Sequence, residues 1–298
     1  METIVIGLGG NALLKPSGNQ SVSGEISSIK NIAKTIARLS SRFNIVITHG
    51  NGTQVGDELI KNKNSGLEML PLYLLNAETQ GSIGSIIETA INSSRPGKPF
   101  CTVVTHVVVD KSDDAFSVPT KPIGPFYTKR ELGKGSKGQF SYIKENGMFR
   151  IVVPSPRPIK ILEIEQIKHM LKRFNVICGG GGGIPVFIEG NSIIGANAVV
   201  DKDYTTQLIA TTIKARRMIL LTNADYVYKD FAGRKGKIKK ISMQEINSMI
   251  RNFEEGTIRP KIDACIRFIK NGGEIAQIGS INMLDKIIKK ESGTLITR

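Results

Sequence analysis

The chain contains no tryptophan, only three cysteines and three histidines, and no apolar run long enough to cross a membrane. Its cysteines, Cys101, Cys178 and Cys265, lie far apart, a spacing that suits neither a disulfide framework nor a metal-binding knuckle. A zinc site is therefore not expected. Apolar runs such as residues 100–109 are too short for a bilayer, and the run after Glu2 lacks the basic region of a signal peptide. These absences predict a cytoplasmic protein without a membrane segment.

Charge of one sign is abundant, since the formal net charge is +15. The lysines and arginines are spread through the chain and form no basic tail and no patch interleaved with aromatic residues. This distribution favours a basic surface around a site for an anionic polyphosphate over a nucleic-acid interface. No nucleic-acid partner is expected.

Apolar segments with strand and helix patterns alternate along most of the 298 residues. Strands are expected at 4–6, 43–47, 100–109, 176–178, 218–221 and 275–278, and helices at 27–42, from 56 onward, and at 69–92, 161–173, 198–215 and 261–271. Short strands that alternate with helices predict a three-layer αβα sandwich with a mostly parallel central sheet. The length permits one large domain or two lobes.

Residues 110–158 interrupt this alternation. They are rich in proline and glycine and include the run PTKPIGPFY at 119–127. A structureless loop of this length is unusual inside a compact domain. We therefore expect an inserted subdomain, rich in β-structure, that lies over the active site as a lid.

Two turns rich in glycine and asparagine follow the first two expected strands. They are Gly9, Gly10 and Asn11 in the first turn and Gly50, Asn51 and Gly52 in the second. Backbone N–H groups at the carboxyl edge of a parallel sheet can point at an anion. We assign the first turn to a transferring phosphoryl group and the second to a small acceptor.

These turns belong to a series of motifs that extends over nearly the whole chain. The series comprises Gly9-Gly10-Asn11-Ala12-Leu13, His49-Gly50-Asn51-Gly52, Gln80-Gly81-Ser82-Ile83-Gly84, residues 119–127, Val153-Pro154-Ser155-Pro156, residues 180–186, Asp201-Lys202-Asp203 and Pro260-Lys261. In this order the motifs closely resemble those of the carbamate kinases, a branch of the amino-acid-kinase superfamily. The resemblance covers residues from about 4 to about 296, and the Pro-Thr-Lys-Pro motif is its most specific part.

The resemblance implies a fold, a reaction and partners. The fold is a single amino-acid-kinase domain over residues 1–298, with the lid at 110–158 and a nucleotide-binding lobe at about 216–298. The reaction is reversible phosphoryl transfer between ATP and carbamate, which gives ADP and carbamoyl phosphate. Mg²⁺ is implied as the cofactor, held through the nucleotide phosphates, and a homodimer is implied as the assembly.

The resemblance also implies roles for individual residues. Asp201 and Asp203 would orient active-site lysines, Lys202 and Lys261 would face the phosphates, Lys121 would reach down from the lid, and Asp225 and Tyr228 would contact the nucleotide. Without the resemblance, the preferred interpretation of Asp201-Lys202-Asp203 is the acidic cap of a helix with an exposed lysine, and a tight turn without a ligand is an alternative for the glycines at 179–183. Thr53, Asn223 and Arg259 depart from the family pattern.

The chemistry implied for the acceptor explains why the site needs no histidine as a general base. A carbamate or carboxylate is already an anion, so its phosphorylation requires no general base. His49, His106 and His169 are therefore expected to be structural. The transfer instead needs alignment and positive charge, which lysines, backbone N–H groups and Mg²⁺ supply.

Two other functions remain open at this point. A kinase of another small carboxylate, such as an acetylglutamate-type enzyme, would lack the Pro-Thr-Lys-Pro motif and would usually carry a lysine before the first glycine turn, where residues 4–6 hold none. A nucleotide-binding regulator that has lost turnover is the second alternative. The intact set of Lys121, Lys202 and Lys261 argues against it.

Overall fold

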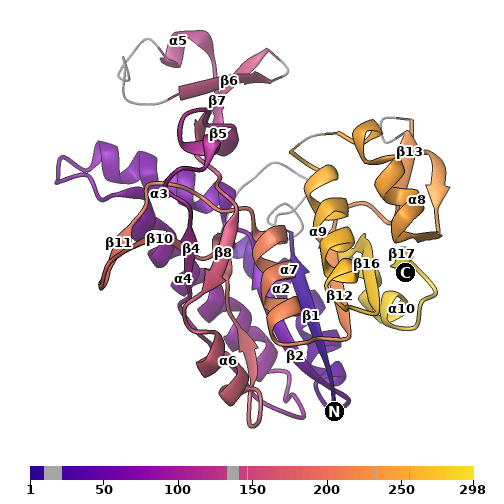
Figure 1. Cartoon of the computed structure of the whole chain (residues 1–298). Coiled ribbons are helices and arrows are strands. Elements are labelled where there is room, and N and C mark those ends of the chain that lie inside the picture. The colour runs from indigo at the N-terminus through magenta and orange to yellow at the C-terminus, as the bar shows by residue number, and fades with distance from the viewer. Residues whose placement is uncertain (10–21, 133–140, 146, 231–232, 255) are drawn as a thin grey trace.

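The computed structural model describes residues 1–9, 22–132, 141–145, 147–230, 233–254 and 256–298. Within these residues the largest sheet has eight strands, in the order β15-β17-β16-β12-β1-β2-β9-β3. Their bounds are β1 (Glu2–Leu8), β2 (Phe43–His49), β3 (Phe100–Thr102), β9 (Asn175–Ile177), β12 (Arg217–Thr222), β15 (Lys240–Ser242), β16 (Ile275–Ser280) and β17 (Thr294–Thr297). Neighbouring strands are parallel except for β16 and β17. The predicted αβα sandwich with a mostly parallel sheet is confirmed (Figure 1).

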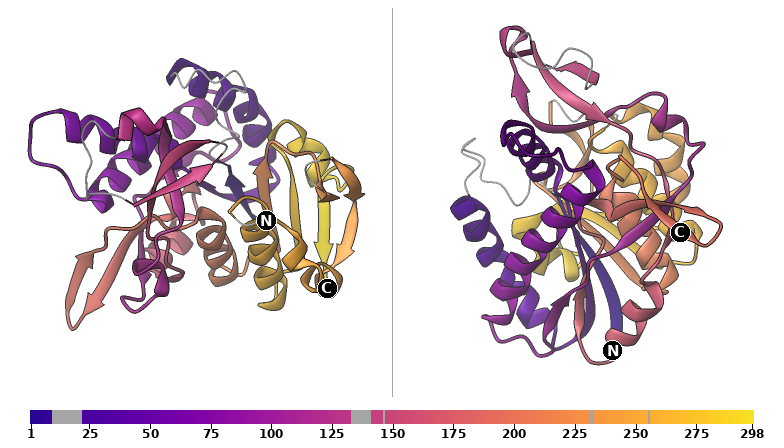
Figure 2. Two further views of the ribbon diagram at one scale, coloured as in Figure 1. Left: turned by 90° about the horizontal axis from the view of Figure 1, so that it is seen from above. Right: turned by 90° about the vertical axis from the view of Figure 1, so that its left-hand side faces the viewer.

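Alternate residues of the central strands face two separate hydrophobic cores. Ile4 and Ile6 of β1 pack against α2 (Val22–Leu39) and α4 (Leu72–Asn92). Val5, between them, belongs to the core on the opposite face, which includes α6 (Ile164–Met170), α7 (Lys202–Thr212) and α9 (Arg259–Lys270). Because side chains alternate across a strand, an unbroken apolar run is buried on both faces. The right-hand view of Figure 2 shows helices on both sides of the sheet.

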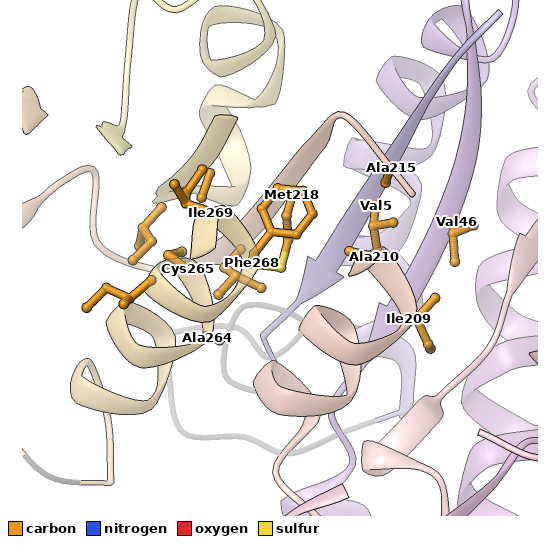
Figure 3. Packing of buried hydrophobic residues seen from close by; sticks show 14 of the residues in the cluster. Val5, Val46, Ile209, Ala210, Ala215, Met218, Ala264, Cys265, Phe268 and Ile269 are labelled. Atoms are coloured by element: carbon orange, nitrogen blue, oxygen red, sulfur yellow. The ribbon is translucent and has the colours of Figure 1, made fainter. Parts of the chain in front are cut away.

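Helices α7 and α9 lie next to each other on one face, and their packing sets the position of their first turns. Phe268 of α9 is fully buried beside Met218 of β12, and Ala210 of α7 lies near Val5 (Figure 3). A side chain at Gly7 would meet Leu220 and Thr206, so glycine there lets α7 approach β1 closely. Both helices begin at the carboxyl edge of the sheet.

Three smaller sheets complete the described part of the chain. One contains β4 (His106–Val109), β8 (Pro158–Ile161), β10 (Ile184–Glu189) and β11 (Ser192–Gly195), and another contains β13 (Val227–Asp230) and β14 (Lys235–Ile238). The third contains β5 (Lys121–Tyr127), β6 (Ser141–Glu145) and β7 (Met148–Val153). It stands at the end of the molecule toward which the central strands point (Figures 1 and 2). No helix among the described residues is both long and apolar enough to cross a membrane.

The expectation of one strand over residues 100–109 was wrong. The segment divides into β3 in the central sheet and β4 in a different sheet. At Thr105, between them, the backbone N–H donates to Gln80 Oε1 at 2.6 Å, and the carbonyl accepts from Gln80 Nε2 at 3.3 Å. The side chain of a neighbouring helix thus satisfies the backbone where the chain leaves the central sheet. Two helices are also shorter than expected, because residue 161 belongs to β8 and α7 begins only after its cap at Asp201.

Candidate active site

Gly9 and Gly50, the residues directly after β1 and β2, lie at the carboxyl edge of the sheet. The N–H of Gly9 donates to the carbonyl of Leu221 at 3.1 Å, and the N–H of Gly50 donates to the carbonyl of Leu8 at 3.1 Å. These two amides complete the sheet and are therefore not free to bind an anion. Gly10 and Asn11 lie outside the described residues.

The second turn leads directly into a helix, whose positive end lies at the acceptor turn. Asn51 is the N-cap of α3 (Gly52–Asn64), and its carbonyl accepts the first helical hydrogen bond from Val55 at 2.8 Å. The N–H groups of the first turn have no partner within a helix, and the first turn of α3 carries no acidic residue. Together with the helix dipole, this makes the start of α3, at Gly52, suitable for an anion.

Three lysines from three different elements meet at two aspartates, and we call these five residues the lysine cluster. They are Lys121 of β5, Asp201, Lys202 and Asp203 at the start of α7, and Lys261 of α9. Lys121 pairs with Asp201 and Lys202 pairs with Asp203. Lys261 Nζ lies 3.0 Å from the second oxygen of Asp203. Every predicted catalytic residue is therefore in one place, with one positive charge in excess.

The environment keeps the carboxylates of the cluster charged. Asp203 is only 2% exposed. Burial raises the pKa of Asp203, but Lys202 and Lys261 lower it more, so the net pKa lies below its ordinary value. The pKa of Asp201 is lowered in the same way, against the effect of burial, chiefly by Lys121 and Lys261. A carboxylate held in its charged form keeps its lysines in position.

The two lysines beside Asp203 are not equivalent. Burial lowers the pKa of Lys202, and the nearby Asp203 opposes this only in part. Burial also lowers the pKa of Lys261, but Asp203 and Asp201 outweigh it, so that pKa is raised. Lys261 donates in addition to the carbonyl of Thr257 at 3.2 Å.

Local sequence explains why these side chains converge. Asp201 caps α7 by accepting a hydrogen bond from the N–H of Asp203 at 2.9 Å, which is the cap predicted for this motif and places Lys202 in the first turn. Pro260 is the second residue of α9, where proline is tolerated because the first N–H groups of a helix have no partner within it, and it places Lys261 in the first turn. Thr206 ties α7 to β2, because its hydroxyl lies 2.6 Å from that of Thr48.

A second, uncharged group of side chains surrounds the acceptor turn, and sequence reasoning missed most of it. We call Asn51, Asn76 and Thr79 the amide cluster. Asn51 Nδ2 donates to Asn76 Oδ1 and, at 2.8 Å, to Thr79 Oγ1, and Asn76 Nδ2 donates to the carbonyl of Gly183 at 2.6 Å. The signal in the sequence was a polar set, Asn76, Thr79 and Gln80, at helical spacing on the otherwise apolar buried face of α4.

The glycine run at 179–183 packs beneath this turn. A side chain at Gly180 would overlap the ring of His49, and one at Gly181 would overlap the amides of Asn51 and Asn76. Gly181 also has a φ of 62°, which strains other residues. Gly180 and Gly181 therefore lack side chains because His49, Asn51 and Asn76 occupy that space, whereas a side chain at Gly182 would meet Val200.

The histidines take part in structural contacts. Burial lowers the pKa of His49 to about 4, so its ring is neutral, and its Nδ1 lies 3.2 Å from the carbonyl of Gly50. His106 Nδ1 lies 2.7 Å from Glu163, and His169 is exposed on α6. A general base is not required of any of them.

The residues expected near the nucleotide lie farther along the same edge, after β12. The hydroxyl of Tyr228 donates to Asp225 at 2.8 Å, so the two predicted nucleotide contacts are themselves joined. Arg259, the first residue of α9, donates from Nε to the carbonyl of Ile250 at 3.2 Å. Its side chain therefore makes at least one contact with the 250–252 turn.

Comparisons with known proteins agree with this geometry. The model of the amino acid kinase family matches residues 2–280. The chain belongs to the amino acid kinase family. Two curated relatives in this family are carbamate kinases. The one from Thermoplasma acidophilum is 38% identical, with 100% of each chain covered, and the one from Oenococcus oeni is 36% identical, with 99% of this chain and 98% of that protein covered.

Solved structures place the chain in the same branch of the family. The structure of carbamate kinase from Giardia lamblia bound to citric acid has a TM-score of 0.91 and 31% identity, and covers 99% of this chain and 98% of that one. The same Giardia enzyme has been solved bound to AMP-PNP, with a TM-score of 0.88, 31% identity and the same coverage. Within the amino acid kinase family, the chain groups with the carbamate kinases.

Proposed function

We propose that the chain catalyses reversible phosphoryl transfer between ATP and carbamate, which yields ADP and carbamoyl phosphate. The observation that carries this proposal is the lysine cluster, in which three ammonium groups meet beside the acceptor turn. Membership of the carbamate kinase branch supports the choice of carbamate as acceptor.

In this reaction a carbamate oxygen attacks the γ-phosphorus of ATP, and the bond from that phosphorus to the β–γ bridging oxygen breaks. ADP leaves with the electron pair, and no proton moves, so no general base is required. Lys202 and Lys261 would stabilise the charge on the transferring group, while Asp201 and Asp203 hold the lysines in place. The turns at Gly9 and Gly50, with the start of α3, would align phosphoryl group and acceptor.

The projecting sheet within residues 110–158 would act as a lid that delivers Lys121. Support comes from the contact between β5 and α3, where the backbones at Gly124 and Gly56 meet directly. The element that carries Lys121 therefore rests on the helix that begins at the acceptor turn. The whole chain would work as a single domain.

The nucleotide would lie against the lobe at about 216–298, with Asp225 and Tyr228 at its edge, and Mg²⁺ would accompany it. No group of three histidine, cysteine or acidic residues suited to a metal is found in the described ranges, and Asp201 and Asp203 already hold lysines. This set fits Mg²⁺ bound through the nucleotide phosphates, whose charge the metal would offset. We also propose a homodimer in the cytoplasm.

The test measures ATP formation from ADP and carbamoyl phosphate in the presence of Mg²⁺. The wild type should form ATP, and the variant Lys202→Ala should not form it at a comparable rate. Lys270→Ala is the matched control, because Lys270 is exposed in the last turn of α9. ATP formation by the wild type no faster than by Lys202→Ala would refute the proposal.

A further inference from the structure

The amide cluster fixes which edge of the Asn51 side chain remains available to a ligand. Asn51, Asn76 and Thr79 are 1%, 0% and 3% exposed. A carboxamide carries two N–H donors on nitrogen and an acceptor on oxygen. Because a buried amide is held by its partners, the orientation of Asn51 follows from what those partners can donate or accept.

One anchor of this orientation is a backbone carbonyl. The carbonyl of Gly183 can only accept, so the side chain of Asn76 must present its nitrogen there, at 2.6 Å. The oxygen of Asn76 therefore faces Asn51 and must receive a donor. The only donor on the Asn51 side chain is Nδ2.

The second anchor is independent and gives the same result. The hydroxyl of Thr79 donates to the carbonyl of Leu75 at 2.9 Å, which uses its single proton. It can then only accept from Asn51 Nδ2, at 2.8 Å. Both protons of Asn51 Nδ2 are thus committed to α4, and its Oδ1 accepts no hydrogen bond from the residues that the structure describes.

The available oxygen belongs to the N-cap of α3, next to the first-turn amides that suit an anion. The turn therefore offers N–H donors for a carboxylate and one acceptor for an N–H group. Carbamate and carbamoyl phosphate combine an anionic end with an amino group. Acetyl phosphate has a methyl group of similar size in that place and cannot donate.

We propose that Asn51 Oδ1 accepts a hydrogen bond from the amino group of the substrate, and that Asn76 and Thr79 are positioning residues that hold this oxygen in place. This inference rests on the proposed function. Sites built to hydrogen-bond a substrate N–H reject an analogue that lacks it, because the buried polar group is then left unpaired. The amide cluster would therefore determine the preference for a carbamoyl over an acetyl group.

The experiment compares kcat/KM for carbamoyl phosphate with kcat/KM for acetyl phosphate, with ADP as the common co-substrate. Thr79→Val removes one acceptor and keeps the shape of the side chain, so it should lower the ratio about tenfold, whereas Thr79→Ser should restore it. Asn76→Ala should lower the ratio at least as much. A change in stability alone would affect both substrates equally and leave the ratio unchanged.

The matched control is Asn92→Ala on the same helix. The side chain of Asn92 also binds backbone groups, because it donates to the carbonyl of Phe100 and accepts from the N–H of Phe100, both at 2.9 Å. Asn92 lies at the end of α4 that is far from the amide cluster. This variant should lose stability and keep the wild-type ratio. If Asn76→Ala fails to fold, the ratio measured for Thr79→Val still tests the proposal.

The outcomes separate the two proposals. A wild-type ratio in Thr79→Val, with both activities measurable, would overturn the role of the amide cluster and leave the proposed function intact. A wild type that forms no ATP from carbamoyl phosphate would overturn the proposed function, and the inference with it.

Discussion

The lysine cluster and the amide cluster meet at the same edge of the central sheet but are built from opposite chemistry. In the first, three ammonium groups are held by two carboxylates, and Asp203 serves two lysines at once. In the second, neutral amides and a hydroxyl are held by hydrogen bonds that end on backbone carbonyls. The held ammonium groups supply positive charge for phosphoryl transfer, whereas the short neutral groups fix the orientation of one amide. Rate and specificity should therefore be separable by mutation.

The largest expected effect comes from removing a charge from the lysine cluster. Lys202→Ala or Lys261→Ala should lower kcat about a hundredfold or more, because an electrostatic donor to the transition state contributes on the order of 3 kcal/mol. Nucleotide affinity, measured by calorimetry, should change much less. Lys261→Arg should restore only part of the kcat that Lys261→Ala loses, since a planar guanidinium does not reproduce a compact ammonium. Near-wild-type kcat in both alanine variants would contradict the division of roles.

Protonation of His49 introduces a charge on the uncharged side of the site. Its ordinary pKa of 6.5 falls to about 4 in the folded protein because the ring is buried, so the unfolded chain binds a proton more readily. The contribution of His49 to the free energy of unfolding should be unchanged above pH 6.5, fall as the pH drops toward 4, and level off below it, where protonation of Asp201 and Asp203 takes over. The total loss amounts to up to about 3 kcal/mol.

Urea unfolding at several pH values checks this slope. In His49→Gln the slope between pH 6.5 and 5 should be reduced relative to the wild type. His106→Gln is the control, because the hydrogen bond to Glu163 raises the pKa of His106 and gives a contribution of opposite sign. Equal slopes in the wild type and His49→Gln would show that His49 is not the titrating group.

A smaller effect is expected where α3 joins the lid strand to the acceptor turn. A methyl group at Gly56 would overlap the backbone of Gly124, which cannot rotate away. Gly56→Ala should therefore destabilise the protein by about 1–3 kcal/mol, as overpacking does. Gly81→Ala, on α4 with no heavy atom within 4 Å of the added methyl, should instead stabilise by roughly 0.5–1 kcal/mol. Thermal unfolding of both variants measures the difference, and equal shifts would contradict the close contact.

The parts of the site that the sequence predicted are those carried by local rules. The helix cap at Asp201, the helix start near Pro260 and the strand-to-turn transitions at Gly9 and Gly50 depend on neighbouring residues, and the structure has each of them, although α9 begins at Arg259, two residues before the expected start at Lys261. The strand break at Thr105 was missed because it depends on Gln80, 25 positions away.

The amide cluster was missed for the same reason. Asn76 lies 25 positions from Asn51 and 107 from Gly183, and no spacing rule connects them. The involvement of the Gly9 and Gly50 amides in the sheet was also invisible, because the sequence shows where a turn begins and not which of its N–H groups are already used. The lid role of residues 110–158 stays a prediction.

The pairing within the lysine cluster has a consequence for how tightly substrates are held. Each ammonium group already has an oxygen partner before any ligand arrives, and because an ammonium group carries three N–H donors, a phosphate oxygen can join that partner without displacing it. The carboxylates already offset part of the lysine charge, which reduces the binding free energy of a phosphate, yet the ammonium groups need no reorganisation when charge develops on the phosphoryl group. We expect this arrangement to favour turnover over high affinity for substrate or product.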